Sequence, residues 1–493
     1  MKTFSFAYKL LLVGAFLSSG LFAIPAFCQE AGNVLELQRV IEAQQKQLET
    51  QQNQLEMQQK QLGEQMQLLQ QFQQQLNALD KDENKKEIPS VAKNVPVEKP
   101  VVVAENRPSK GTGLSETDKH DRVSPTGSNI SYFDPAKAIN IPGTKTDIGL
   151  HGLAQFQIIH DTNGLNNNRF DSATIPVDGA PSQTKFNVNP SQIALSSTSQ
   201  VSKGRLNTMI SMDFNGQLDR PEPRLRVLYG EYVSDYLGLG VLAGQTYATM
   251  FDLGAAPETL DFAGPAALWQ QRQPLLRFTK SIAEGMIAEI AIETPENVSY
   301  IDAEKRTQWP DLAVAGTWRA GGDYIKHLRL AGLVRDLHAE GVNGSTDQAI
   351  GWAVSGSGKL GLPFLGEKDN FKFTMHYGDG YGSQLKGGPT EGAFNTLNSE
   401  LETTRVIGTY GGIQHFWSNR LRSNFVYGYV NSENPDFVSG DTFDNTTYTA
   451  LDLIWAPYEN FNCGVEYLWG QRENKNSESG TSNRFLFSTK FAF

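Results

Sequence analysis

SNRFLFSTKFAF, residues 482–493, gives the clearest structural signal in the chain. Every second position carries a member of one set, namely Phe485, Phe487, Thr489, Phe491 and Phe493. The positions between them carry Arg484, Leu486, Ser488, Lys490 and Ala492. Successive side chains of a β-strand point to opposite faces, so this stretch would have one aromatic face and one polar or small-residue face. The period of two predicts a strand whose aromatic face meets an apolar environment.

The same alternation recurs between residues 145 and 493, in segments separated by clusters of Gly, Asn, Asp and Pro. Sixteen segments begin near residues 146, 185, 204, 223, 237, 271, 285, 310, 325, 346, 370, 404, 420, 446, 460 and 482. An even strand number and alternating short and long connections are typical of outer-membrane barrels. A soluble β-sandwich also alternates, but here aromatics crowd the ends of the apolar faces. The predicted fold class is an all-β transmembrane barrel of sixteen antiparallel strands, preceded by an N-terminal α-helical coiled coil.

Residues 1–28 have the composition of a secretory signal peptide. Lys2 and Lys9 supply positive charge, an apolar stretch follows, and small residues lie near its end. We expect this segment to be removed on export. The alternative is a lipoprotein modified at Cys28, but bulky Phe27 stands where lipoprotein signals carry a small residue.

A heptad pattern occupies residues 33–80. Apolar residues recur at intervals of seven, including Ile41, Leu48, Leu55, Leu62, Leu69 and Leu76. The second core position of the heptads is mostly glutamine, which specifies partners more than it adds stability. The pattern predicts a periplasmic coiled coil that oligomerises, with a Gln-rich disordered tract as the alternative. Residues 81–144 are rich in Pro, Lys and Glu without periodicity, and are predicted to form a flexible linker.

The composition excludes several classes of function. A formal net charge of −11 disfavours a nucleic-acid-binding protein, which would normally be basic. Two cysteines cannot form a Cys-rich zinc site, and the seven histidines show no metal-binding spacing. No nucleophile elbow or phosphate-binding loop occurs in the sequence. We therefore predict no enzymatic activity, no cofactor, no metal and no nucleic-acid partner.

Six arginines are in phase with the inward face of the predicted strands. They are Arg224, Arg226, Arg277, Arg335, Arg405 and Arg422. Neighbouring Leu225, Val227 and Leu276 mark the lipid face, where a charge at mid-membrane would cost about 2–4 kcal/mol. We expect the six guanidinium groups to line the lumen and contact permeating anions, because a guanidinium matches a carboxylate bidentately. The alternative is that they pair with luminal acids such as Asp213 and Glu289.

The connection 246–271 is long and rich in Gly, Ala and Pro. Its acidic residues are Asp252, Glu258 and Asp261. Apolar residues such as Phe251 and Trp269 need a wall to pack on, which argues against an exposed loop. It is the third long connection from the N-terminus, and in porins the third loop folds into the lumen. We expect this loop to fold inward, so that its acids face the arginines across a constriction.

Several stretches resemble the DcaP-like porins of Gram-negative outer membranes. They are GQTYATMFDLGAAPETLDFAGP (244–265), RQPLLRFTK (272–280), RLRVLYGEY (224–232), GVEYLWGQR (464–472) and the final FAF. The resemblance covers nearly the whole chain and implies a sixteen-stranded trimeric porin, whose basic constriction passes dicarboxylates and related small anions. It places Arg224, Arg226 and Arg277 on the basic wall. Neutral Gln192 stands where an Arg is common in that family, so the substrate preference is expected to differ.

The sequence therefore predicts a homotrimeric outer-membrane porin that admits small anionic solutes, with its coiled coil in the periplasm. Phe487, Phe491 and Phe493 match the C-terminal signal that the barrel-assembly machinery recognises, and outer-membrane lipid would be the other partner. One alternative is a structural protein that tethers the outer membrane to the cell wall. Another is a sugar porin with an N-terminal coiled coil, which would carry aromatics along its lumen rather than on the lipid face.

Overall fold

The computed structural model describes residues 138–493, except 164, 166–167, 218–219, 270 and 307–308. The predicted signal peptide (1–28), the predicted coiled coil (33–80) and residues 81–137 of the predicted linker lie outside the described residues. Helical structure in the described part consists of short 3₁₀ turns, namely η2 (Ser172–Thr174), η3 (Leu253–Ala255) and η4 (Gly382–Gln384). Nowhere in this part is a helix long and apolar enough to cross a membrane.

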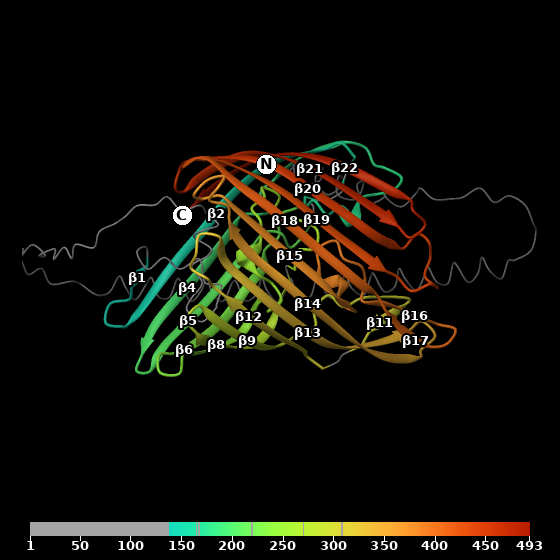
Figure 1. The fold of residues 1–493 in the computed structure, drawn as a ribbon, viewed down its shortest axis with the longest axis horizontal. Coiled ribbons are helices and arrows are strands. Elements are labelled where there is room, and N and C mark those ends of the chain that lie inside the picture. The colour runs from blue at the N-terminus through green and yellow to red at the C-terminus, as the bar shows by residue number, and fades with distance from the viewer. Residues whose placement is uncertain (1–137, 164, 166–167, 218–219, 270, 307–308) are drawn as a thin grey trace, which may run out of the picture. The chain divides into compact units, whose positions relative to one another are not determined.

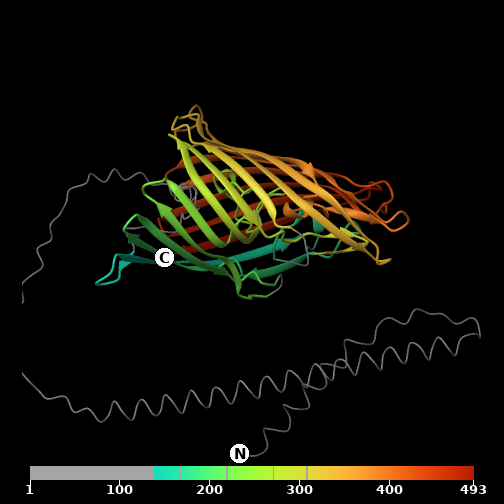
Figure 2. The ribbon, with the colours of Figure 1, turned by 90° about the horizontal axis from the view of Figure 1, so that it is seen from below.

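Sixteen strands form a closed antiparallel β-barrel, tilted side by side around its wall (Figure 1, Figure 2). In chain order they are β2 (Thr146–Asp161), β4 (Gln192–Val201), β5 (Gly204–Asp213), β6 (Arg224–Ser234), β7 (Leu239–Tyr247), β8 (Arg272–Ala283), β9 (Met286–Glu293), β12 (Asp311–Trp318), β13 (Ile325–Gly341), β14 (Thr346–Gly361), β15 (Asn370–Asp379), β18 (Arg405–Ser418), β19 (Leu421–Glu433), β20 (Phe443–Tyr458), β21 (Phe461–Asn474) and β22 (Ser479–Ala492). Each pairs with the next, and β22 closes the barrel against β2. The predicted strand number and antiparallel arrangement are confirmed.

The strands begin within three residues of the predicted positions, with one exception. The second predicted segment, at 185, is divided into β3 (Gln183–Asn187) and β4, which both pair with β2. Pro190 lies in the gap, and proline has no N–H to donate to a β-ladder. Further short strands are β1 (Ile139–Asn140), β10 (Tyr300–Ile301), β11 (Ala303–Lys305), β16 (Gly392–Asn395) and β17 (Glu400–Thr403).

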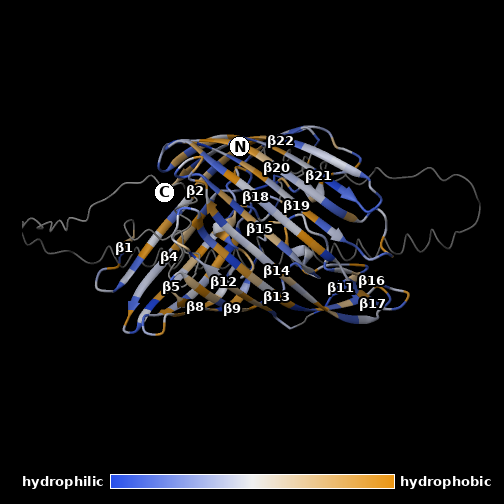
Figure 3. Cartoon of the chain, in the orientation of Figure 1, coloured by the Kyte–Doolittle hydropathy of each residue, from blue (hydrophilic) through white to orange (hydrophobic). Residues whose placement is uncertain are grey.

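The apolar face of the strands points out of the barrel. On β22, Phe485, Phe487 and Phe491 are exposed, whereas Leu486 and Ser488 between them are buried inside. Figure 3 shows hydrophobic and hydrophilic residues interleaved along the strands, as this alternation requires. An outward apolar face with a polar interior is the arrangement that a lipid bilayer favours.

A β-bulge in β6 changes the face of one predicted lipid-facing residue. Between the pairs Ser211–Val227 and Met212–Leu225 the register skips Arg226. Val227 is buried and packs in an interior cluster with Ala194, Met209, Tyr229, Leu242 and Leu275. The expectation that Val227 faces lipid is therefore wrong, because the extra residue of a bulge reverses the phase of the strand beyond it.

Long connections lie at one end of the barrel, together with the short turns 342–345 and 475–478, and the connections at the other end are all short. The long ones include 162–182, 214–223, 248–271, 294–310, 380–404 and 434–442. The short turns include 202–203, 235–238, 284–285, 419–420 and 459–460. Outer-membrane barrels place such long loops outside the cell and the short turns in the periplasm.

The C-terminus completes the seam of the barrel. Phe493 donates its backbone N–H to the carbonyl of Gly152 and accepts the N–H of Gly152, each at 3.0 Å. The Phe493 ring lies over Gly152, where a Cβ would stand 1.9 Å from the ring. Glycine at position 152 therefore leaves room for the terminal aromatic.

We expect Phe493→Ala to lower the yield of folded barrel in the membrane several-fold, because the substitution removes the proposed assembly signal and the ring that covers the seam. Single-channel conductance of the surviving protein should not change, since Phe493 points outward. Heat-modifiable mobility on gels would measure the yield. Phe364→Ala, at an exposed aromatic in a turn at the same end of the barrel, is the matched control. If Phe493→Ala gave the wild-type yield, Phe493 would have no special role in assembly and would only contact lipid.

Candidate functional site

The connection between β7 and β8, residues 248–271 and hereafter loop 3, lies in the barrel interior. It contacts inward-facing side chains of β13 and β14, then of β18 and β19, and finally of β21. In the sheet order β13 lies three strands beyond β8, whereas β18 and β19 lie across the barrel from β7 and β8. Loop 3 therefore crosses the lumen and divides it, which makes the interior beside it the candidate functional site.

Glycines on the inward face of the opposite strands give loop 3 its space. A Cβ on Gly428 of β19 would lie 2.7 Å from the carbonyl oxygen of Ala266, and one on Gly412 of β18 would lie 2.7 Å from Pro257. Real Cβ atoms do not approach so closely, so these positions require glycine for loop 3 to lie where it does. In the sequence, the signal for this packing was the presence of small residues at the inward-facing positions of the strands.

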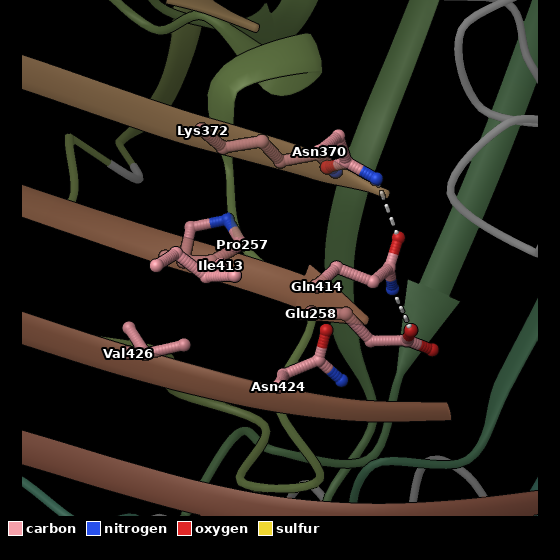
Figure 4. A pocket seen from close by; sticks show the side chains of 9 residues that line it. Pro257, Glu258, Asn370, Lys372, Ile413, Gln414, Asn424 and Val426 are labelled. Carbon is pink, nitrogen blue, oxygen red and sulfur yellow. Dashed lines mark hydrogen bonds between the residues drawn. The ribbon is translucent and has the colours of Figure 1, made fainter. Parts of the chain in front are cut away.

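Glu258 anchors the middle of loop 3 through a bidentate ion pair. Arg422 on β19 donates from Nε and Nη2 to the two carboxylate oxygens at 2.7 and 2.6 Å. Gln414 on β18 donates to the same carboxylate at 2.7 Å and accepts from Asn370 at 3.1 Å, in a narrow pocket shown in Figure 4. Burial alone would raise the pKa of the Glu258 carboxyl, but the Arg422 charge and hydrogen bonds bring it down to about 2.

Asp252 anchors the beginning of loop 3 in the same manner. Its carboxylate lies 2.9 Å from Nε2 of His327 on β13 and accepts the hydroxyl of Ser357 on β14 at 2.7 Å. Burial opposes ionisation here too, but His327 and then Arg329 lower the pKa of Asp252 to about 2.

Asp261 is buried near the end of the crossing. Lys386 Nζ lies 3.7 Å and Arg484 Nη1 4.0 Å from its carboxylate, and the backbone N–H of Phe170 donates to it at 3.3 Å. The three loop acids thus each have a basic partner on another loop or on the wall. Of the predicted arginines, Arg422 pairs with a loop acid, Glu258, in direct contact, whereas Asp252 and Asp261 have other basic partners.

The basic side of the interior is centred on Asp213 of β5. Arg224 donates to both of its carboxylate oxygens at 3.0 and 2.7 Å, and Arg226 donates at 2.8 Å. Arg226 also donates to the hydroxyl of Tyr247 at 2.9 Å and lies over the ring of Phe262 from loop 3 at 5.5 Å. The Arg224 side chain keeps 27% of its surface exposed, so it faces the open part of the interior.

Two further arginines join this group, and sequence reasoning missed both. Arg272 donates to the Tyr247 hydroxyl at 3.4 Å, and Arg169, from the connection 162–182, interacts electrostatically with Arg224 and Asp213. Burial and then the Arg224 charge lower the pKa of Arg169. Arg272 is five residues from Arg277 on β8, so strand phase assigns the two to opposite faces, and Arg169 lies in a loop without periodicity. The strand pattern therefore gave no signal for either residue. We call Arg169, Arg224, Arg226 and Arg272 the arginine cluster.

Arg277 binds the first residues of loop 3 and does not belong to the arginine cluster. Its Nε donates to Thr249 Oγ1 at 2.9 Å, and its guanidinium lies 3.9 Å from Glu289 and from Glu293. Arg329, on β13, donates to the Thr249 carbonyl at 2.7 Å and pairs with Glu289. The alternative of pairing with luminal acids thus describes Arg277 correctly.

Arg335 is fully buried and links three elements. It pairs with Asp311 at the start of β12, at 2.5 Å, and with Glu391 of the connection 380–404, at 3.1 Å. Burial raises the pKa of Glu391 despite the Arg335 charge. With both carboxylates bound to it, Arg335 fixes the connection 380–404 to the wall.

Arg405 does not face the lumen, so that expectation is wrong. It is half exposed on the outer side and pairs with Glu433 at 3.0 Å. The inward phase of β18 begins one residue later, at fully buried Val406, and continues at Gly408. A Cβ on Gly408 would lie 3.1 Å from the Cβ of Ala267, so loop 3 occupies the space that an inward side chain would need.

The barrel interior presents charged groups and hydrogen-bonding groups to a solute. Among the described residues, no group of three or more His, Cys, Asp or Glu side chains is arranged to hold a metal ion. The acids of loop 3 are engaged by Arg, His and Lys, and the most exposed member of the described ion pairs around Asp213 is Arg224.

Comparisons with known proteins agree with this architecture. Residues 134–493 match the family model described as DcaP outer membrane protein. The chain is similar to the outer membrane channel DcaP of Acinetobacter baumannii, with 19% identity over 72% of this chain and 99% of that one, and a TM-score of 0.64. OmpT of Vibrio cholerae (10% identity, 72% and 99% covered, TM-score 0.47) and an anion-selective porin from Comamonas acidovorans (9%, 71% and 100%, 0.47) also match. None of the curated proteins matches the chain.

Glu258→Gln should loosen loop 3, because it leaves the buried Arg422 without its carboxylate, a loss on the order of 3 kcal/mol. The variance of the open-channel current in planar bilayers should rise at pH 7. A carboxyl with a lowered pKa stabilises the fold above its unfolded pKa and loses that contribution as pH falls through its folded pKa. The current variance of wild-type channels should therefore stay low at pH 5 and should approach that of the variant only near pH 2.

The matched control is Glu433→Gln, which breaks the exposed pair with Arg405 on the outer side and should leave the current unchanged. Equal current variance in Glu258→Gln and wild type would show that Glu258 does not anchor the loop.

Proposed function

The chain belongs to the DcaP family of outer membrane proteins, and from that premise we propose that it is a trimeric diffusion channel for small anions, including dicarboxylates. The family is one of outer-membrane channels without enzymatic activity. The selectivity for anions, the dicarboxylate substrate and the trimer are the proposed parts.

The arginine cluster carries the proposal. Four guanidinium groups lie around Asp213, which forms close ion pairs with both Arg224 and Arg226. The cluster therefore gathers several guanidinium groups on one side of the interior. Guanidinium groups that are partly desolvated bind carboxylates more strongly than they would in water. A doubly charged anion can replace part of its hydration shell with hydrogen bonds from two of these arginines at once.

Transport requires that the anion also leave. Arg224 and Arg226 already donate to Asp213, so an incoming carboxylate competes with an internal partner. This competition keeps binding weak, and several weak sites conduct better than one tight site. Asp213 would in this way tune the release of the solute while holding the arginines in place.

The net charge of −11 is compatible with anion passage. Selectivity depends on the charges that line the narrowest path, not on the sum over the chain. Inside the barrel, Glu258 is paired with Arg422, and Asp252 lies beside His327 and under the influence of the Arg329 charge. Loop 3 therefore contributes little negative field to the path, and the arginine cluster dominates it.

Replacing Arg224 and Arg272 together by Gln should shift the reversal potential in a salt gradient toward cations. It should also weaken block by a short dicarboxylate about tenfold, or about 1.4 kcal/mol. Arg405→Gln is the matched control, because it removes one positive charge outside the barrel interior. If the double variant keeps wild-type selectivity and block, the arginine cluster has a structural role only.

We propose that the protein is a homotrimer, on the grounds of the heptads at 33–80 and the broad apolar outer face of the barrel. Deleting residues 33–80 should leave a trimeric, conducting barrel, because a glutamine-rich coiled-coil core adds little stability beyond register. Mass measurement in detergent and bilayer conductance would test this. Recovery of monomers alone would show that the coiled coil, not the barrel, holds the trimer together.

A further inference from the structure

A second connection packs against loop 3 inside the barrel. This second connection, residues 380–404, is hereafter called loop 6. Its residues 384–388 run antiparallel to the end of loop 3. The N–H of Ala267 donates to the Lys386 carbonyl at 2.9 Å, and the N–H of Lys386 donates to the Leu268 carbonyl at 3.0 Å. Trp269 of loop 3 stacks on Tyr381 of loop 6, with ring centroids 5.6 Å apart. The division of the lumen is thus built from two loops.

The Lys386 side chain reaches back across both loops. Its Nζ donates to the Gly264 carbonyl, lies 3.7 Å from Asp261 Oδ2, and sits 5.1 Å from the ring centroid of Tyr448 on β20. Only about a tenth of the side chain is exposed. One lysine of loop 6 therefore contacts a backbone carbonyl and an acid of loop 3 and an aromatic ring of β20.

We propose that Lys386 is a positioning residue that clasps loop 6 onto loop 3 and so fixes the width of the channel. This inference rests on the proposed function, in which loop 3 bounds the path of the anion. Neither loop reaches its position through the barrel strands alone, since the two loops pair with each other.

The local chemistry explains why a lysine occupies this position. Asp261 Oδ2 is buried and accepts no hydrogen bond, so the ammonium group of Lys386 supplies its close positive charge on this side. Burial lowers the pKa of Lys386, and Asp261 opposes that effect. An uncharged side chain would leave Asp261 with Arg484 at 4.0 Å and the Gly264 carbonyl without its donor. Loss of a partner from a buried charge is strongly destabilising.

Gly264 and Gly387 permit the close contact of the two loops. Their φ angles are +69° and +70°, in the left-handed region that glycine occupies without strain. Each turn directs the chain so that Lys386 lies beside the Gly264 carbonyl. The clasp is therefore built into the backbone of both loops and not only into one side chain.

The test uses the full-length protein with Lys386→Met, Lys386→Gln and Lys386→Arg. In Met and Gln variants, backbone amides of residues 260–269 should exchange hydrogen about tenfold faster, as local opening becomes easier. Mean conductance should rise and the open-channel current should fluctuate more. Lys386→Arg should restore much of the wild-type exchange and current, because it keeps the charge. Heat-modifiable mobility would show that each barrel is folded.

Lys475→Met is the matched control. Lys475 donates to the carbonyls of Pro435 and Asp436, so it also joins two connections, but away from loop 3. It should leave exchange in residues 260–269 and conductance unchanged. Unchanged exchange in both Lys386→Met and Lys386→Gln would overturn the clasp, and so would equal loosening by Lys475→Met.

The two proposals can fail separately. Ion selectivity of the wild-type channel tests anion passage without reference to Lys386. A cation-selective wild type with accelerated exchange in Lys386→Met would reject the proposed function and keep the clasp. An anion-selective wild type with unchanged exchange would do the reverse.

Discussion

In a lipid bilayer, every backbone N–H and C=O must find a hydrogen-bond partner within the chain, and the rest of this structure depends on that constraint. The pairing of β22 with β2 meets it by leaving no strand edge open to lipid. Closure in turn divides the side chains into an outward apolar set and an inward polar set. The polar set then shares a confined interior, where charges are costly unless they are paired.

Pairing of interior charges gives the acids and the arginines different roles. Glu258 on loop 3 is paired with Arg422 of the wall, and Asp252 lies beside His327, so these acids fix the loop. Around Asp213, one carboxylate is paired with the two guanidinium groups of Arg224 and Arg226. In the proposed function, these arginines supply positive charge to the path, although the chain as a whole is acidic.

The fold was predictable from the sequence because strand period, turn residues and even strand number are all local properties. Strand β22 illustrates this, since its pattern alone identifies both faces. The site was less predictable, because it depends on where that period breaks. A bulge at Arg226 turns Val227 inward, and the inward phase of β18 begins at Val406, which leaves Arg405 outside. Neither break has a signal in one sequence.

Partner choice was the other part that periodicity could not supply. Phase placed Arg277, Arg335 and Arg422 in the interior, but all three bind acids that come from loops or neighbouring strands. The pairs of Arg335 with Glu391 and of Arg422 with Glu258 depend on the three-dimensional course of loop 6 and loop 3, whereas the acids that Arg277 binds lie on the adjacent strand β9. Arg169 lies in a connection without regular pattern, so its approach to Arg224 could not be inferred.

A long loop can define a channel only if its contacts offset the conformational entropy that is lost when its backbone is held in one position. Fixing the backbone of one residue costs about 1–2 kcal/mol, and loop 3 is long. Anchors at Thr249, Asp252, Glu258 and Asp261 spread this cost along the loop, and the pairing with loop 6 secures its far end. None of these anchors belongs to the arginine cluster. Under the two proposals, width and charge selectivity are set by separate residues, so evolution could alter the preferred anion through the cluster while the loops keep the same opening.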